Sequence, residues 1–151
     1  MPNSTQILAT TTIAISASLP ETFNDDVSTG YPSVTYTAIG EVTDWSAGGK
    51  VFNVVTSNPI AQRNTDKYKG TVNNGADTFT VNRDDDDAGQ VIILAALASD
   101  NAYSFKITFS DATDDFYTGK VVSFDTVAGG ADSIVQRTIQ VERNRDTIVT
   151  T

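Results

Sequence analysis

The sequence predicts a mainly β fold with a single α-helix. One stretch, residues 84–109, holds the chain's only long apolar run and carries the helix signal. The rest of the 151 residues is rich in Thr, Val, Ser and Ala, with Gly scattered through it. Its segments either alternate apolar and polar residues or collect turn-forming residues, which is typical of strands and their connections.

The helix is predicted at residues 88–99. Residues 91–98 are apolar at every position, so periodicity alone does not separate a helix from a strand. Asp87 and Gln90 have the capping-box spacing, in which the Asp87 carboxylate accepts from the Gln90 backbone N–H and the Gln90 side chain reaches back. Asp84, Asp85 and Asp86 then lie where the helix dipole favours anions.

The helix is also predicted to be a core element. Five large side chains, each stabilising by about 1.5–3 kcal/mol on burial, would together match the whole net stability of a typical domain. The core residues are predicted to be Val91, Ile92, Ile93, Leu94 and Leu97.

Composition predicts one domain over residues 1–151 and excludes several function classes. Lys and Arg total 10 against 19 Asp and Glu, a net charge of −9, which disfavours binding to nucleic acid through phosphate contacts. The chain has no histidine and no cysteine, so the commonest catalytic base and metal ligands are missing. We expect no enzyme activity, no cofactor and no membrane span, and the amino terminus has no signal-peptide pattern.

The remaining elements follow in order. Strands are expected at residues 7–16, 34–45 with a break at Gly40, 50–56, 77–83, 103–109, 115–125 and 133–143, with a tail at 145–151. Residues 18–33 are expected to form an ordered loop. Residues 57–76 show neither period and are predicted to be a long loop, functional or disordered. That loop carries Arg63, Lys67, Tyr68 and Lys69. Its three cations are nearly a third of the 10 in the chain.

Several strings, in this order, resemble the tail tube (major tail) proteins of long-tailed, lambda-like bacteriophages. They run from residues 19–24 with Gly30 and Tyr31, through 39–44, 69–70 and 77–81, to the closing strands at 103–109, 116–123 and 137–141. The resemblance covers nearly the whole chain. It implies a β-sandwich or half-barrel subunit that forms hexameric rings, which stack into a hollow tube lined by a continuous β-barrel through which the genome passes.

The resemblance also implies partners and a location. The subunit would bind copies of itself, the tail tip and terminator proteins and the tape measure protein, in the virion tail after assembly in the host cytoplasm, and DNA would pass without specific binding. No extra immunoglobulin-like domain is expected. A type VI secretion-like tube protein remains an alternative, as does a β-sandwich binding module with Trp45 in a groove.

Two sets of residues are predicted to serve assembly. The strand expected at residues 133–143 has one apolar and one polar face. Its polar face and that of the earlier strand around residue 42 together form the candidate lumen lining. Its candidate residues are Glu41, Thr43, Gln136, Thr138, Gln140 and Glu142. The candidate contact to the next subunit or ring is the loop bearing Arg63, Lys67, Tyr68 and Lys69, with Asp84, Asp85, Asp86 and Asp87 as its acidic partner.

Two acidic clusters could indicate a calcium site or a catalytic site. The run at residues 84–87 fails the EF-hand spacing because Ala88 and Ala95 stand where ligands are needed, leaving only loose calcium binding open. Asp111, Asp114 and Asp115 could supply the pair of carboxylates that glycosidases require, but three acids within five residues at a strand turn favour a solvated hairpin.

Overall fold

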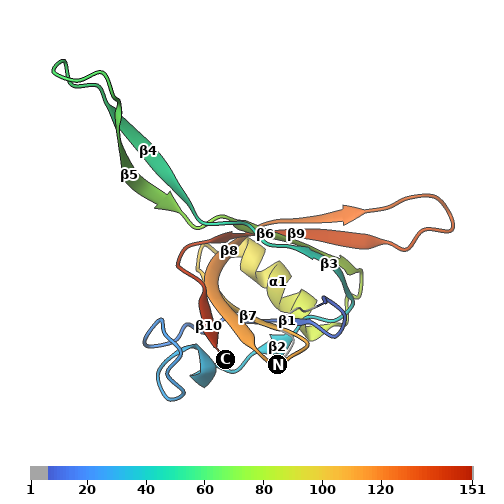
Figure 1. The fold of residues 1–151 in the computed structure, drawn as a ribbon. Helices are drawn as coiled ribbons and strands as arrows, with labels where there is room; N and C mark the ends of the chain where they lie inside the picture. Colours follow the sequence, from blue (N-terminus) through green and yellow to red (C-terminus); the bar gives the residue numbers. More distant parts are fainter. Residues whose placement is uncertain (1–6, 151) are drawn as a thin grey trace.

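The computed structural model describes residues 7–150 and is mainly β, as predicted (Figure 1). It contains one α-helix, a short 3-10 turn at Tyr31–Ser33 and ten strands within those residues. The elements are β1 Thr12–Ser16, β2 Thr37–Ala38, β3 Val42–Ser46, β4 Val51–Ser57, β5 Asp66–Asn73, β6 Ala76–Asn82, α1 Ala88–Ala98, β7 Tyr103–Thr108, β8 Asp114–Val127, β9 Gln136–Arg143 and β10 Ile148–Thr150.

Eight strands form one antiparallel sheet, in the order β2-β1-β7-β8-β9-β6-β3, with β10 added beside the start of β8. In Figure 1 this sheet curls into a half-barrel, and α1 packs against β8, β1 and β2. The long strand β8 joins the two halves. It pairs with β7 through Gly119 and with β9 from Gly119 onward, across a bulge between Val121 and Ser123.

The core lies inside the curl and follows from period-2 patterning. Alternate residues of β1, β6, β7 and β9 are buried because successive side chains of a strand point to opposite faces. Phe105 and Tyr117 stack with ring centroids 5.2 Å apart. The buried apolar cluster is Ile13, Ile15, Ile39, Phe79, Val81, Ile93, Ala96, Phe105, Ile107, Tyr117, Val121, Ile139 and Val141.

The helix begins at Ala88, as predicted, and one of the two predicted capping-box hydrogen bonds is present. Asp87 Oδ2 accepts from the Gln90 backbone N–H at 3.0 Å and from the Gly40 N–H at 3.1 Å. The Gln90 side chain does not return to the cap residue. Its Oε1 accepts from the Asp84 N–H at 3.2 Å and its Nε2 donates to the Asn82 carbonyl at 2.9 Å, so it fastens the helix to the end of β6.

The predicted core residues of the helix are largely wrong. Ile93 is 0% exposed and Ile92 packs at the edge of the core, whereas Leu94 is 53% exposed, and Val91 and Leu97 are exposed as well. The physical reason is that only one side of a helix meets the sheet. Here that side holds Gly89, Gln90, Ile93 and Ala96. A run that is apolar at every position gives no sign of which side this is.

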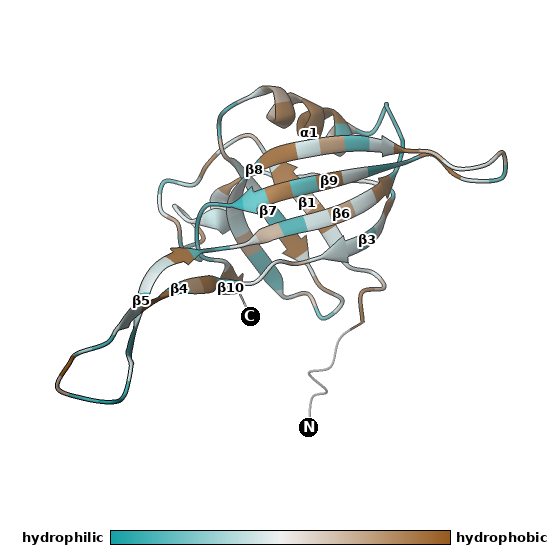
Figure 2. Ribbon diagram, turned by 90° about the horizontal axis from the view of Figure 1, so that it is seen from above, coloured by the Kyte–Doolittle hydropathy of each residue, from teal (hydrophilic) through white to brown (hydrophobic). Residues whose placement is uncertain are grey.

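The predicted loop at residues 57–76 is also wrong. Its second half is the strand β5, which pairs with β4 to form a two-stranded hairpin separate from the main sheet. Both Figure 1 and Figure 2 show this hairpin projecting away from the body. The true connection within it is residues 58–65, between Ser57 and Asp66.

Smaller differences concern the ends of strands. The first strand begins at Thr12, because a turn with Thr10 at a positive φ of 69° precedes it. The strand predicted at residues 34–45 is broken near Gly40, as expected, into β2 and β3. The predicted tail contains β10, which pairs with β8. Residues 1–6 and 151, parts of the predicted termini, lie outside the described residues.

Candidate functional site

The most extended candidate site is the outward face of the strands β8, β9, β6 and β3. Figure 2 shows these strands side by side, with hydrophilic and hydrophobic bands alternating along them. Residues directly opposite each other share a face, so the register defines the polar side. It consists of Asp44, Ser46, Thr78, Thr80, Asn82, Lys120, Ser123, Asp125, Gln136, Thr138, Gln140 and Glu142, with the apolar residues Ala76 opposite Glu142 and Val127 opposite Gln136.

The register puts four of the six predicted lumen residues on this polar face. Gln136, Thr138, Gln140 and Glu142 lie opposite Asn82, Thr80, Thr78 and Ala76 across the β9–β6 ladder. Thr43 lies exposed in the bulge of β3, and its Oγ1 donates to the Thr80 carbonyl at 3.2 Å.

Glu41 differs from its prediction as a strand residue. It precedes β3 with a positive φ of 61°, so its side chain does not follow the alternation of the strand. Its Oε2 accepts from Asn82 Nδ2 at 3.4 Å, which sets it at the rim of the polar face.

The polar face is bounded by two strand edges without a partner among residues 7–150. One is β3, the last strand of the sheet. The other is the half of β8 beyond Gly119, where β7 no longer pairs with it. Such edges expose backbone donors and acceptors that pair readily with another chain.

A buried ion pair anchors the root of the projecting hairpin. The Arg143 guanidinium donates to the Asp77 carboxylate through Nε to Oδ1 and Nη2 to Oδ2, both at 2.8 Å. The same carboxylate accepts from the Gly48 N–H at 3.3 Å, just before β4, and from Trp45 Nε1 at 3.3 Å. Asp77 is 0% exposed. Four donors therefore converge on one carboxylate beneath the hairpin.

This ion pair was not predicted, although the sequence contains a signal for it. Asp77 stands at the inward positions of β6 with Phe79 and Val81, so a charge occurs where the period requires an apolar side chain. Arg143 also lies 4.4 Å from the centroid of the Tyr117 ring, a cation–π distance. Burial is the main cause that raises the pKa of the Tyr117 hydroxyl well above its usual value.

The hairpin carries the predicted cations on exposed strands. Lys67, Tyr68 and Lys69 are in β5, and Arg63 is in the connection. Lys69 Nζ lies 4.9 Å from the Phe52 ring centroid and Lys50 Nζ lies 5.4 Å from it. All seven residues of β4 are exposed, including four large apolar ones. An isolated hairpin of this kind is at best marginally stable in water.

The predicted acidic partner is partly occupied within its own chain. Asp85 pairs with Arg83 at 2.8 Å and with Arg137 at 2.7 Å, and the hydrogen bond from Arg83 is the main cause that lowers the pKa of Asp85. Asp87 is the helix cap, and Asp84 Oδ1 accepts from the Asp86 N–H at 3.1 Å. The Asp86 carboxylate makes no hydrogen bond or ion pair with residues 7–150.

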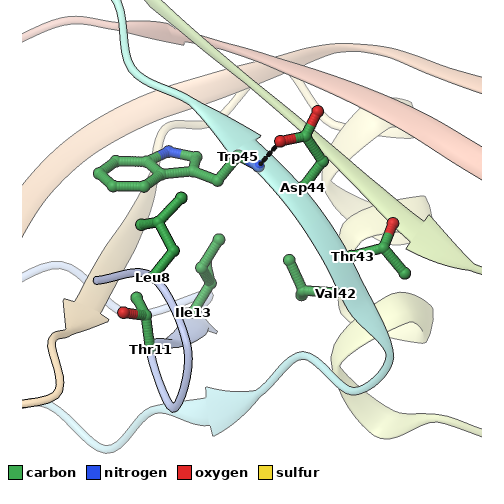
Figure 3. A pocket seen from close by; sticks show the side chains of 7 residues that line it. All are labelled: Leu8, Thr11, Ile13, Val42, Thr43, Asp44 and Trp45. Atoms are coloured by element: carbon green, nitrogen blue, oxygen red, sulfur yellow. Dashed lines mark hydrogen bonds between the residues drawn. The ribbon is translucent and has the colours of Figure 1, made fainter.

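A small recess lies beside the free edge of β3 (Figure 3). Its volume is about 60 Å³, and Leu8, Thr11, Ile13 and residues 42–45 line it. Trp45, which the binding-module alternative expects in a groove, lines this recess and is partly buried. Its ring packs 5.9 Å from Phe109, centroid to centroid, and its Nε1 donates to Asp77.

The other acidic cluster has ordinary turn chemistry. Asp111 Oδ1 accepts from the Thr113 hydroxyl and N–H, and Asp114 Oδ1 accepts from the Thr108 hydroxyl at 2.7 Å. Burial raises the pKa of Asp115. Over residues 7–150 no group of three or more acidic, His or Cys side chains is placed to hold a metal ion. Within the same range no helix is long and apolar enough to cross a membrane.

No protein-family model and no curated protein matches this sequence, so similarity to known proteins rests on structure. A chain of the sheath/tube terminator of the extracellular contractile injection system PVC superposes with a TM-score of 0.68 at 11% identity, covering 99% of both chains. A chain of the PVC sheath–tube complex gives 0.67 at 11% identity, covering 98% of this chain and 93% of that one. The SPP1 tail tube gives 0.59 at 15% identity, covering 93% and 76%.

The fold is that of the tail-tube proteins. At these identities the comparisons establish the tail-tube fold alone. They confirm the mainly β tail-tube fold expected from the sequence, and the assembly into a hexameric ring stays a prediction.

Proposed function

We propose that the protein is a structural subunit of a bacteriophage tail tube, in which hexameric rings stack into a hollow tube that conducts genomic DNA during ejection. The observation that carries this proposal is the polar four-strand sheet with an open edge on each side. In a ring, the β3 edge of one copy pairs with the free half of β8 in the next, and the rotation closes the contact into a continuous barrel. Closure removes both open edges at once.

The polar face of the sheet is the proposed lumen lining. This face carries three acids, Asp44, Asp125 and Glu142, and one cation, Lys120. A fourth acid, Glu41, lies at its rim. Such a surface has few cations to hold phosphates, so DNA passes without specific binding. The candidate lumen residues Thr43, Gln136, Thr138 and Gln140 add neutral hydrogen-bonding groups.

The β4–β5 hairpin is the proposed contact to a neighbouring subunit or ring, replacing the loop that the sequence predicted. Its exposed apolar strands need a partner, and its cations Arg63 and Lys67 have no acidic partner among residues 7–150. The tail tip, terminator and tape measure proteins are the further partners in this proposal, the virion tail is the location, and assembly takes place in the host cytoplasm. No catalytic role is proposed.

A second candidate is the tube of a contractile injection or type VI-like secretion system. The superpositions on chains of the PVC particle favour it, because their TM-scores of 0.68 and 0.67 exceed the 0.59 for SPP1. The two candidates share the hexameric ring, and they differ in cargo and in how firmly the rings of the isolated protein stack.

Negative-stain images of the concentrated protein test the proposal. Long tubes of stacked rings support the phage tube, loosely stacked or isolated hexamers favour the secretion tube, and monomers at every concentration contradict both. A variant that joins Lys50 directly to Asn74, removing β4 and β5, tests the hairpin. It is expected to fold and to form no tubes, whereas normal tubes from it would reject the hairpin's role.

A further inference from the structure

The outer side of α1 is an apolar surface that nothing in the described chain covers. Val91, Leu94 and Leu97 are exposed there, spaced one helical turn apart, with Ala95 and Ala98 beside them. The helix contains no charged residue from Ala88 to Ala98. Contiguous exposed apolar surface of this kind marks an interaction site.

The two faces of the β4–β5 hairpin differ in chemistry. The register puts Phe52 opposite Val72 and Val54 opposite Lys69. Because side chains alternate along β4, Phe52, Val54 and Thr56 share one face, and the approach of Lys50 and Lys69 to the Phe52 ring sets these lysines on that face. We call this the lysine face. Its apolar residues are Phe52, Val54 and Val72, and its cations are Lys50, Lys67 and Lys69.

The opposite face of the hairpin has no lysine. Val55 lies opposite Tyr68 there, and Ser57 lies opposite Asp66. A Cβ at Gly70 would meet the Val55 side chain at 3.0 Å, which sets Gly70 on this second face. Both faces of the hairpin therefore carry exposed apolar side chains, and they differ in charge, because one carries lysines and the other carries Asp66.

Charge distinguishes which face fits α1. Acids stand at both ends of the helix, with Asp84 and Asp86 before it and Asp100 after it. The Asp86 and Asp100 carboxylates, like the Lys67 ammonium, have no ionic partner among residues 7–150. The apolar side of α1, which lies between acids, complements the apolar residues beside Lys67 and Lys69 on the hairpin. Lys50, the third lysine of that face, already pairs with Asp146 of its own chain at 2.8 Å.

The reach of the hairpin requires that the helix belong to another copy. Eight residues of β5 at about 3.3 Å each span about 26 Å. Figures 1 and 2 show the hairpin directed away from the body, and so away from α1 of its own chain. We infer that the lysine face of the β4–β5 hairpin docks on the exposed apolar side of α1 in a second copy of this chain. This inference rests on the proposed tube function and adds the surface that receives the hairpin.

Because the sequence has no cysteine, paired cysteine substitutions test the contact on a clean background. The test protein carries Val54→Cys and Leu94→Cys, positions that are 63% and 53% exposed, so neither change disturbs the core. The matched control carries Val55→Cys and Leu94→Cys, since Val55 is the next residue, is 53% exposed and lies on the other face. Both proteins are concentrated to assemble, oxidised and run on non-reducing gels.

The first pair is expected to give a ladder of linked chains, on the order of tenfold more than the control, because a disulfide requires Cα atoms within about 7 Å. Tubes without this ladder, or equal ladders from both pairs, overturn the docking while the tube function stands. A ladder without tubes supports the docking and rejects the tube. Neither ladder nor tubes rejects both.

Charge reversal provides an independent test. Lys67→Glu and Asp86→Lys are each expected to raise the protein concentration needed for assembly, because each brings like charges together. The double variant is expected to recover part of the loss. A double variant that assembles no better than either single change overturns the proposed pairing of the lysine face with the acids of α1.

Discussion

The ion pair beneath the hairpin gives the most specific stability prediction. Asp77→Asn keeps the shape of the side chain and removes its charge, so Arg143, whose side chain is 10% exposed, is left buried without an anionic partner. Breaking a buried pair in this way costs about 3–5 kcal/mol. The asparagine retains one acceptor oxygen for the Gly48 or Trp45 donor, so we expect the lower end, about 3 kcal/mol.

The free energy of unfolding from urea titration measures this cost. For a chain of this size a loss of about 3 kcal/mol lowers the melting temperature by about 6–12 °C. Arg143→Gln and the double variant complete a thermodynamic cycle, and because the two side chains touch, the double loss is expected to be smaller than the sum of the single losses. A loss below about 1 kcal/mol for Asp77→Asn, or strictly additive losses in the cycle, would refute the reasoning.

Three further predictions follow from burial and backbone contacts. Ile93→Ala is expected to cost about 2–5 kcal/mol of unfolding free energy, and Leu94→Ala less than about 1 kcal/mol; equal losses in urea titrations would contradict the assigned helix face. Because burial raises the pKa of Asp115, the folded state binds that proton more tightly, so acidification from neutral pH towards about pH 4 adds stability through this group. Asp115→Asn should therefore raise the midpoint of urea unfolding at neutral pH and remove the stability gained on acidification. A variant whose stability depends on pH as the parent's does would contradict this prediction. Gly48→Ala sets a Cβ against the backbone of Ala76, so hydrogen exchange should accelerate in the hairpin while the main sheet keeps its protection; unaltered exchange in the hairpin would exclude strain at its root.

Local chemistry made much of the fold predictable. The Asp87 cap located the start of α1 because a side-chain acceptor at that position satisfies a helix N–H that has no other partner. Period-2 alternation located β1, β6, β7 and β9, since each buries one face. The same alternation in β9 separated Ile139 and Val141 from the polar residues of the candidate lumen lining.

The wrong predictions for the hairpin and the helix share a physical cause. The sequence of a segment does not show which surface that segment packs against. The β4–β5 hairpin buries neither face in this chain, so β5 has no apolar alternation to detect. In α1 every candidate position is apolar, and only the position of the sheet decides that Ile93 and not Leu94 is buried. Glu41 leaves the strand pattern because its backbone turns at a positive φ.

The Asp77–Arg143 pair shows a different limit. A charged residue at an inward strand position signals a buried partner but does not identify it. Arg143 lies 66 residues away along the chain and is brought to Asp77 by the β6–β9 ladder, whose register pairs Asp77 with Val141. Only the sheet topology puts the guanidinium against the carboxylate.

In the proposed tube, copies of this chain close into rings through the edges of one polar sheet. Cryo-electron microscopy of the concentrated protein tests it most directly. We expect stacked hexameric rings in which β3 of each copy pairs with the free half of β8 in the next, with Gln136, Thr138 and Gln140 facing the lumen. Rings that present these side chains on the outer wall, or a protein that stays monomeric at every concentration, would contradict it.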